Sequence, residues 1–315
     1  MNSITRTQCA EFLREHDNYL LMTHRRPDGD TLGSASALCL ILRRLGKRAY
    51  LMANPEITPK YADFVSDLIA PEDWREDTLV AVDLAAETMF PETYRGNAIA
   101  LCIDHHGSNT FYAGMTFVRP EKAACGEVVL ELIDELGCGM DGRTASLLYI
   151  AISTDTGCFL YGNTTPDTHR AAAAVMAAGA EYGKLNKLLF RTMSEARMNL
   201  ECMIYEGMRR YKNGEINIAV ITLDMMAKTG ATENDCDDLA SIAGKIEGSK
   251  CSATIRETSP GVSKVSLRSG RHVNSSAVCA RYGGGGHPMA AGCTMPYAPE
   301  EAREILAQAI IEAWQ

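Results

Sequence analysis

Residues 23–34 read THRRPDGDTLGS and directly follow the apolar run YLLM at residues 19–22. The run is typical of a buried strand, and three side chains that can bind metal follow it at once: His24, Asp28 and Asp30. A solvated turn can carry the same carboxylates by chance, so this stretch alone leaves both interpretations open. The rest of the chain decides whether this stretch is a solvated surface turn or part of a metal-binding site.

The first half of the chain predicts an α/β fold built on a parallel sheet. Residues 31–45 show small and apolar side chains at helical spacing and are followed by Gly46, a residue type that commonly ends helices. Residues 48–52 then predict a second strand, which completes a β-α-β start. The apolar runs at 78–82 and 98–103 are typical of further buried parallel strands.

Side chains that can bind metal recur just after these apolar runs. Asp83 follows the third predicted strand, DHH at 104–106 follows the fourth, and TDTG at 154–157 follows a predicted helix at 144–153. In open α/β sheets, ligands bind beyond the carboxyl ends of the strands. We therefore expect the following side chains at one rim of the sheet: His24, Asp28, Asp30, Asp83, His105, His106 and Asp155.

A smaller α+β domain is expected to follow the parallel-sheet domain after a connection that is largely helical over residues 185–211. The predicted limits are 1–185 for the first domain, 186–205 for the helical linker and 206–315 for the second domain. Within the second domain the patterns predict a strand at 215–223, a helix at 234–247, a hairpin of 250–257 with 262–268, and a helix at 300–314.

Length, charge and cysteine usage restrict the class of protein. A chain of 315 residues exceeds one typical core, which agrees with two domains. The net charge of −9 argues against a protein that coats long nucleic acid, although residues 248–292 carry +5 and the remainder −14. That basic segment suits a short polyanionic ligand and equally a solvated face. The eleven cysteines form no C-x-x-C pair, and no signal peptide or long apolar run occurs, so we expect a reduced cytoplasmic protein.

The expected rim needs cations. Four carboxylates crowded together with three imidazoles would carry too much negative charge without them. Two divalent ions that share one carboxylate would resolve this, and the oxygen and nitrogen donors suit Mn²⁺, with Mg²⁺, Fe²⁺ or Co²⁺ as alternatives. Zinc is more often bound by sulfur or by three imidazoles. Two metals about 3.5–4 Å apart can lower the pKa of a shared water and hold phosphoryl oxygens through an in-line displacement.

Taken together, these motifs resemble the DHH phosphoesterase superfamily, and the C-terminal ones resemble its DHHA1 domain. Their order and approximate spacing match, and together they cover most of the chain. The resemblance is carried by H-x-x-P-D-x-D at 24–30, Asp83, D-H-H at 104–106, T-D-T-G at 154–157, SLRS at 266–269 and GGGGHPMAAG at 283–292.

The resemblance implies roles for the individual side chains. His106 would contact the scissile phosphate and protonate the leaving oxygen, and Asp104 would orient an imidazole. Gly29 would let Asp28 and Asp30 diverge toward different metals. The implied ligands are His24, Asp28 and Asp83 for one metal and Asp30, Asp83, His105 and Asp155 for the other, so that Asp83 bridges the two metals. The implied catalytic residues are Asp83, Asp104 and His106.

The glycine run at residues 283–286 is expected to bind phosphate in the second domain. Consecutive glycines expose backbone N–H groups and tolerate positive φ, which forms a nest for an anion. A flexible linker is the alternative, but a helical segment and the small-residue stretch MAAG flank the run. The expected substrate-binding residues are His106, Arg268, Ser269, Gly284, Gly285, Gly286 and His287.

For function, the resemblance implies a Mn²⁺-dependent enzyme that hydrolyses short oligoribonucleotides and 3′-phosphoadenosine 5′-phosphate (pAp). A standalone phosphodiesterase for cyclic di-AMP and pApA is a close alternative. A family II pyrophosphatase or exopolyphosphatase would carry a different C-terminal domain, and a RecJ-type nuclease would need additional domains. A catalytically silent nucleotide-binding module is opposed by the complete ligand set. We expect no long double-stranded nucleic acid and no membrane as partner, and the sequence is compatible with a homodimer.

Overall fold

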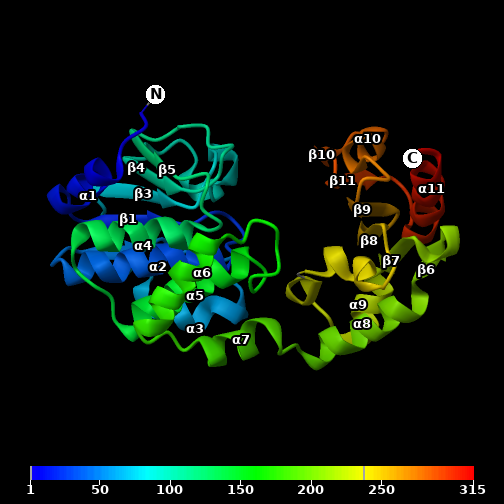
Figure 1. The fold of residues 1–315 in the computed structure, drawn as a ribbon, viewed down its shortest axis with the longest axis horizontal. Coiled ribbons are helices and arrows are strands. Elements are labelled where there is room, and N and C mark those ends of the chain that lie inside the picture. The colour runs from blue at the N-terminus through cyan, green and yellow to red at the C-terminus, as the bar shows by residue number, and fades with distance from the viewer. Residues whose placement is uncertain (1, 237) are drawn as a thin grey trace. The chain divides into compact units, whose positions relative to one another are not determined.

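The computed structural model describes residues 2–236 and 238–315. The chain divides into two compact units, Met1–Thr192 and Met193–Gln315 (Figure 1). The break after Thr192 falls within the stretch 186–205 that the sequence suggests as a linker. Among the described residues, no helix combines the length and the apolarity needed to cross a membrane.

The N-terminal unit contains the predicted parallel sheet. Its five strands follow the order β2-β1-β3-β4-β5, and every neighbouring pair is parallel. The central strands β1 and β3 are buried over their whole length, which explains their continuous apolar sequences. The strands are β1 Tyr19–Met22, β2 Ala49–Leu51, β3 Thr78–Val82, β4 Leu101–Asp104 and β5 Met115–Val118.

Helices cover one face of this sheet, and loops cover the other. Tyr19 and Leu21 belong to a core shared with the helices, whereas Leu20 and Met22 pack in a separate core that includes Phe90. Alternate residues of β1 therefore serve two cores, as the pleat of a strand requires. The helices of the unit are α1 Arg6–Glu15, α2 Gly29–Arg44, α3 Pro59–Val65, α4 Cys125–Leu136, α5 Gly142–Asp155, α6 Pro166–Ala177 and α7 Tyr182–Phe190.

Glycines let three of these helices approach one another closely. A Cβ on Gly33 of α2 would lie 2.4 Å from the carbonyl oxygen of Leu147 and 2.9 Å from the backbone nitrogen of Ala151, both in α5. A Cβ on Gly126 of α4 would lie 2.6 Å from the Cβ of the same Ala151. No larger residue fits at either position unless the helix backbones move apart, so these contacts fix α5 against α2.

The C-terminal unit is built on a mixed sheet of six strands in the order β10-β11-β9-β8-β7-β6. β7 and β8 are parallel, and the other neighbours are antiparallel. Helices α10 and α11 share one core with the sheet, and α8 shares a second core with β7. The elements are α8 Glu195–Gly207, β6 Arg209–Tyr211, β7 Ile216–Ile221, α9 Leu223–Thr229, β8 Cys251–Ser259, β9 Val262–Ser269, α10 Ser275–Ala280, β10 Gly285–His287, β11 Ala290–Met295 and α11 Pro299–Glu312.

The hairpin predicted around TSPG is confirmed as β8 and β9, but the predicted helix at 234–247 is wrong. That stretch contains two 3₁₀ segments, Glu233–Cys236 and Leu239–Lys245, while residue 237 lies outside the described residues. Asp238 has a φ of 64°, a left-handed conformation that a continuous right-handed helix cannot include. The apolar spacing in this stretch reflects packing of Leu239 and Ile242 on the sheet rather than an α-helix.

We expect Gly33→Ala to destabilise the N-terminal unit. Overpacking between two helix backbones typically costs about 1–3 kcal/mol, which corresponds to roughly 2–4 °C of melting temperature per kcal/mol for a unit of this size. Differential scanning calorimetry measures the shift. Gly183→Ala in α7 is the matched control, because nothing lies within 4 Å of the added Cβ there. An unchanged transition for Gly33→Ala would show that α2 and α5 can separate without penalty.

Candidate metal centre

The candidate metal centre lies at the carboxyl ends of three neighbouring strands. β1, β3 and β4 are adjacent in the sheet, and each ends immediately before or within one of the sequence motifs. The N-terminus of α2 and the last residue of α5 bring the remaining ligands. The structure thus brings together the predicted residues His24, Asp28, Asp30, Asp83, His105, His106 and Asp155, with Asp104 beside them.

Local structure explains the turn between β1 and α2. Asp28 is the N-cap of α2, and its Oδ1 accepts hydrogen bonds from the backbone N–H groups of Asp30 (3.0 Å) and Thr31 (3.1 Å). A Cβ on Gly29 would lie 2.4 Å from Oγ1 of Thr154, at the end of α5. Gly29 therefore allows the last turn of α5 to reach α2, a role different from the predicted divergence of Asp28 and Asp30.

One group of possible ligands surrounds His105. Its Nε2 lies 3.4 Å from Oδ1 of Asp83, 3.6 Å from Oδ2 of Asp30 and 3.7 Å from Oδ2 of Asp155. Ligand atoms of Asp30, His105 and Asp155 all lie within 4.8 Å of one another. The spacing leaves room for a cation at the centre of these atoms.

A second group shares Asp83 with the first. Ligand atoms of His24, Asp28 and Asp83 lie within 4.8 Å of one another, and those of Asp83, His105 and His106 do as well. His24 Nε2 lies 3.6 Å from Oδ1 of Asp28. Asp83 is thus common to two of the three groups around it, as a bridging carboxylate would be.

His24 and His105 present the same ring nitrogen, Nε2, to the carboxylates. Nδ1 of His24 lies 2.8 Å from the carbonyl oxygen of Arg25, and Nδ1 of His105 lies 3.2 Å from that of Lys122. A carbonyl only accepts, so Nδ1 carries the hydrogen and Nε2 keeps its lone pair in the neutral ring. This arrangement orients each Nε2 as a metal ligand.

Asp83 is the residue whose surroundings most clearly call for a cation. Its side chain is buried, and its Oδ1 has no hydrogen-bond partner among the described residues. Its backbone has a φ of 65°, a left-handed conformation that aspartate tolerates better than most residues. Burial, together with the charge of Asp30, raises the pKa of Asp83 well above its usual value. A divalent cation would satisfy the unpartnered oxygen and stabilise the ionised carboxylate, so the residues present fit a metal.

Asp30 is held by backbone groups from far along the chain. Its Oδ2 accepts from the N–H of Cys125 (2.7 Å), and its Oδ1 accepts from the N–H of Gly126 (3.0 Å) and the hydroxyl of Ser34 (3.0 Å). Burial raises the pKa of Asp30 to about 7, with a further contribution from Asp155 and an opposing one from His105. The start of α4 therefore orients this carboxylate toward the centre.

His106 differs from His105 because its Nδ1 faces a carboxylate that is already hydrogen-bonded. Nδ1 lies 2.7 Å from Oδ1 of Asp104, and Oδ2 of Asp104 accepts from Nδ2 of Asn109 at 2.7 Å. The bond to Asp104 raises the pKa of His106 against the effect of burial. Burial opposes ionisation of Asp104, but the bonds from His106 and Asn109 outweigh it and lower the pKa of Asp104. The chain Asn109–Asp104–His106 fixes the ring and leaves Nε2 available.

Sequence reasoning missed the groups that position the ligands. Asn109, the backbone N–H groups of Cys125 and Gly126, and the carbonyl of Lys122 carry no motif of their own. They are backbone atoms at the start of α4 or in the loop before it, and one amide side chain, and only the folded chain places them. A sequence signal exists for Asn109 alone, since it lies five residues after Asp104.

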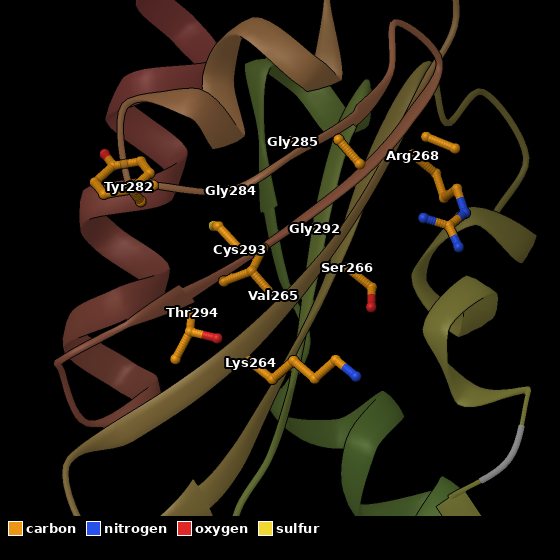
Figure 2. A pocket seen from close by; sticks show the side chains of 13 residues that line it. Lys264, Val265, Ser266, Arg268, Tyr282, Gly284, Gly285, Gly292, Cys293 and Thr294 are labelled. Atoms are coloured by element: carbon orange, nitrogen blue, oxygen red, sulfur yellow. The ribbon is translucent and has the colours of Figure 1, made fainter. Parts of the chain in front are cut away.

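The substrate residues predicted in the C-terminal unit separate into two sets. A cavity of about 600 Å³ is lined by Arg268, Gly284 and Gly285, together with Lys264 and Ser266 (Figure 2).

Ser269, Gly286 and His287 do not line this cavity. The Ser269 hydroxyl is buried and hydrogen-bonds to Val273 O and Ser275 Oγ, both at 2.7 Å. Ser269 therefore fixes the loop between β9 and α10. Nδ1 of His287 accepts from the N–H of Met289 at 3.2 Å. Gly285–His287 forms the exposed strand β10, so part of the expected nest is strand.

Comparison with protein families assigns a domain to each of the two units. Residues 18–152 match the model of the DHH family, N-terminal domain, and residues 215–314 match that of the DHHA1 domain. The chain is 35% identical over 283 residues to the bifunctional oligoribonuclease and PAP phosphatase NrnA of Thermus thermophilus, covering 87% of this chain and 83% of that protein. The protein of the same name from Bacillus subtilis is 28% identical over 312 residues, with 96% of each chain covered.

A solved structure supports the fold. An exopolyphosphatase-related protein from Bacteroides fragilis superimposes with a TM-score of 0.85 at 23% identity, covering 98% of this chain and 96% of that one. At this level of identity the match concerns the fold and carries no information on the substrate.

We expect Asp83→Asn to abolish metal binding while stabilising the metal-free protein. The folded-state pKa of Asp83 is raised, so its contribution to stability is present below the unfolded pKa and lost as pH rises through the folded pKa. At pH 7.5 without metal the variant should therefore melt above the wild type, and with Mn²⁺ the order should reverse. Metal affinity should fall by more than the roughly 10–100-fold that loss of an outer partner costs.

Thermal shift and metal analysis of the purified proteins measure these effects. Asp63→Asn, at an exposed position of α3, is the control. Retention of full Mn²⁺ stabilisation by Asp83→Asn would contradict the bridging position.

The paired variants His105→Ala and His106→Ala should separate metal binding from proton transfer. His105 Nε2 faces three carboxylates, so its loss should lower metal content. His106 is bound to Asp104 through Nδ1, so its loss should lower kcat by about 10²–10⁴-fold at nearly unchanged metal content. Metal analysis and steady-state kinetics on the same preparations distinguish the two; equal metal loss in both variants would make His106 a ligand.

Proposed function

Because the chain belongs to the DHH family, we propose that it hydrolyses short oligoribonucleotides to mononucleotides and pAp to AMP with the help of divalent cations. The observation that carries the proposal is the unpartnered buried oxygen of Asp83, a residue that belongs to two of the three groups of possible metal ligands. The two curated relatives are named for these two activities, and each covers more than four fifths of this chain.

For the metals we propose two Mn²⁺ ions, which, when bound, would activate a water and polarise the phosphoryl oxygens. The nitrogen and oxygen donors suit Mn²⁺, and Mg²⁺, Fe²⁺ or Co²⁺ would fit the same donors. The proposed ligands are His24, Asp28 and Asp83 for one ion and Asp30, Asp83, His105 and Asp155 for the other.

His106 is the proposed proton donor to the leaving oxygen. Its Nδ1 is bound to Asp104, which leaves Nε2 to face the substrate. The raised pKa of His106 favours the imidazolium form, which is the form that can give up a proton. Asn109 holds the other oxygen of Asp104, so the ring keeps one orientation through the reaction.

The charges of the C-terminal unit favour a short substrate. Of the six basic residues at 248–292, three are paired with carboxylates: Lys250 with Glu215, Arg256 with Glu233, and Arg281 with Glu312. Lys264 and Arg268 are exposed, have no acidic partner among the described residues, and line one cavity. The sixth basic residue, Arg271, is also exposed without an acidic partner among the described residues, but it does not line this cavity. The two unpaired cations of the cavity can bind one or two phosphates but not a long backbone.

We also propose a reducing, cytoplasmic location and leave a homodimer as a prediction. All eleven cysteines are free thiols in the structure, and most are buried. Thiols stay reduced most readily in the cytosol.

The expected substrate preference is for dinucleotides to pentanucleotides and for pAp over a long RNA. Initial rates should be measured in parallel with Mn²⁺ on pAp, pApA, cyclic di-AMP, a 24-residue RNA and pyrophosphate. The arm with cyclic di-AMP and pApA tests the neighbouring phosphodiesterase activity. If none of the substrates is hydrolysed in a chelator-sensitive reaction, the protein is a catalytically silent nucleotide-binding module instead of an enzyme. Equal kcat/KM on a dinucleotide and the long RNA would indicate a processive nuclease.

Arg268→Ala should raise KM for the shortest substrates by about tenfold or more, since a charge-assisted hydrogen bond to phosphate is lost. Metal content should not change, because the residue belongs to the C-terminal unit. Arg209→Ala is the matched control: it is exposed on β6, at the opposite edge of the same sheet from β10. An unaltered KM for Arg268→Ala would remove this residue from the substrate site.

A further inference from the structure

Glu127, in the first turn of α4, is a buried acidic residue that belongs to none of the groups of possible metal ligands. It is 2% exposed, and its Oε2 has no hydrogen-bond partner in the part of the chain that the structure describes. Burial raises the pKa of Glu127 above its usual value. A buried carboxyl group is costly for folding, so the role of Glu127 has to be sought in the contacts of its other oxygen.

That oxygen, Oε1, accepts two hydrogen bonds from different parts of the N-terminal unit. One comes from the hydroxyl of Thr168 in α6 at 2.8 Å, and the other comes from the backbone N–H of Ala123 at 3.3 Å. The bond from Thr168 connects α4 to the first turn of α6. The bond from Ala123 fixes the backbone just before α4.

The bond from Ala123 connects Glu127 to a possible metal ligand through a single peptide group. The N–H of Ala123 and the carbonyl of Lys122 belong to the same planar peptide, and that carbonyl oxygen lies 3.2 Å from Nδ1 of His105. Glu127 and His105 therefore bind opposite edges of one rigid plane. Hydrogen bonds in such a chain strengthen one another, so the bond at the N–H makes the Lys122 carbonyl a better acceptor for the ring.

The backbone that follows this peptide is fixed as well. Nδ2 of Asn163 donates to the carbonyl oxygens of Ala123 at 3.1 Å and Asp155 at 3.2 Å. Two N–H groups at the start of α4 bind Asp30. Residues 122–126 therefore form a short stretch of backbone in contact with several parts of the metal centre, and the orientation of its first peptide depends on a side chain of α4.

We propose that Glu127 is a positioning residue of the metal centre, which holds the Lys122–Ala123 peptide so that His105 keeps its hydrogen on Nδ1 and directs Nε2 at the carboxylates. Glu127 acts through the backbone and not as a ligand. The inference rests on the proposed function, because it concerns a ligand of the same site. Groups that orient a ligating imidazole in this way raise the affinity for the metal.

The test compares two variants that remove different bonds of the same oxygen. Glu127→Met keeps the length of the side chain and removes both bonds, whereas Thr168→Val removes the bond to α6 and leaves the bond from Ala123. Calorimetric titration of the metal-free proteins with Mn²⁺ measures the affinity. It should fall by roughly 10–100-fold in Glu127→Met and stay within about twofold of the wild type in Thr168→Val.

Thr168→Val is the matched control because both variants break the bond between α4 and α6. If Glu127 served only to connect these helices, the two variants would lose the same Mn²⁺ affinity, and this outcome overturns the assignment. Unchanged affinity in Glu127→Met overturns it as well. Glu127→Gln keeps an oxygen that can accept from Ala123 and should retain most of the affinity. A loss in Glu127→Gln as large as in Glu127→Met would indicate an effect of charge and contradict the route through the peptide.

Nitrogen-15 NMR of the histidine rings keeps this inference separate from the proposed function, because it needs neither metal nor turnover. In the metal-free wild type, at a pH at which the ring is neutral, His105 should carry its hydrogen on Nδ1, with the signal assigned by its absence in His105→Ala. Thr168→Val and Glu127→Gln should keep this tautomer, and Glu127→Met should shift the ring toward the other one. An unshifted tautomer in Glu127→Met overturns the inference. The shift supports it even if the wild type hydrolyses none of the substrates.

Discussion

The N-terminal unit depends on a concentration of buried carboxylates around Asp83. Burial raises the pKa of both Asp83 and Asp30, so each resists ionisation in the bare protein. Only a cation lets them ionise together, which couples metal binding to the stability of the surrounding fold. The unpartnered Oδ1 of Asp83 marks where that coupling is strongest. In the metal-free protein, ionising the buried carboxylates of Asp30 and Asp83 is unfavourable, and a bound cation would remove that free-energy cost.

Close helix packing makes this concentration of charge possible. Gly29 and Gly33 let α5 lie against α2, and this contact brings Asp155 to the strand ends that carry Asp83 and His105. Hydrogen bonds then separate the roles of the two adjacent histidines. His105 directs Nε2 at the carboxylates, whereas Asp104 and Asn109 hold His106 through Nδ1. The proposed metal ligand His105 and the proposed proton donor His106 are thus neighbours in sequence with different hydrogen-bond partners.

The C-terminal unit uses few charges. Half of the basic residues at 248–292 are neutralised by carboxylates, and Lys264 and Arg268 line one cavity. This arrangement agrees with the proposed preference for small anions and with the acidic character of the whole chain.

The sequence by itself determined where β1 to β4 lie along the chain and which polar residues follow β1, β3 and β4, because apolar runs and the residues after them are local patterns and parallel strands end at one rim. It determined neither the order of the strands in the sheet nor the presence of β5. It also determined the β8–β9 hairpin. Tertiary structure alone decided that Gly29 meets Thr154, that α4 supplies amides to Asp30, and that Asp238 interrupts the predicted helix at 234–247. The amide of Cys125 lies 95 residues from Asp30, and no periodicity along the chain encodes which backbone groups become neighbours when helices pack.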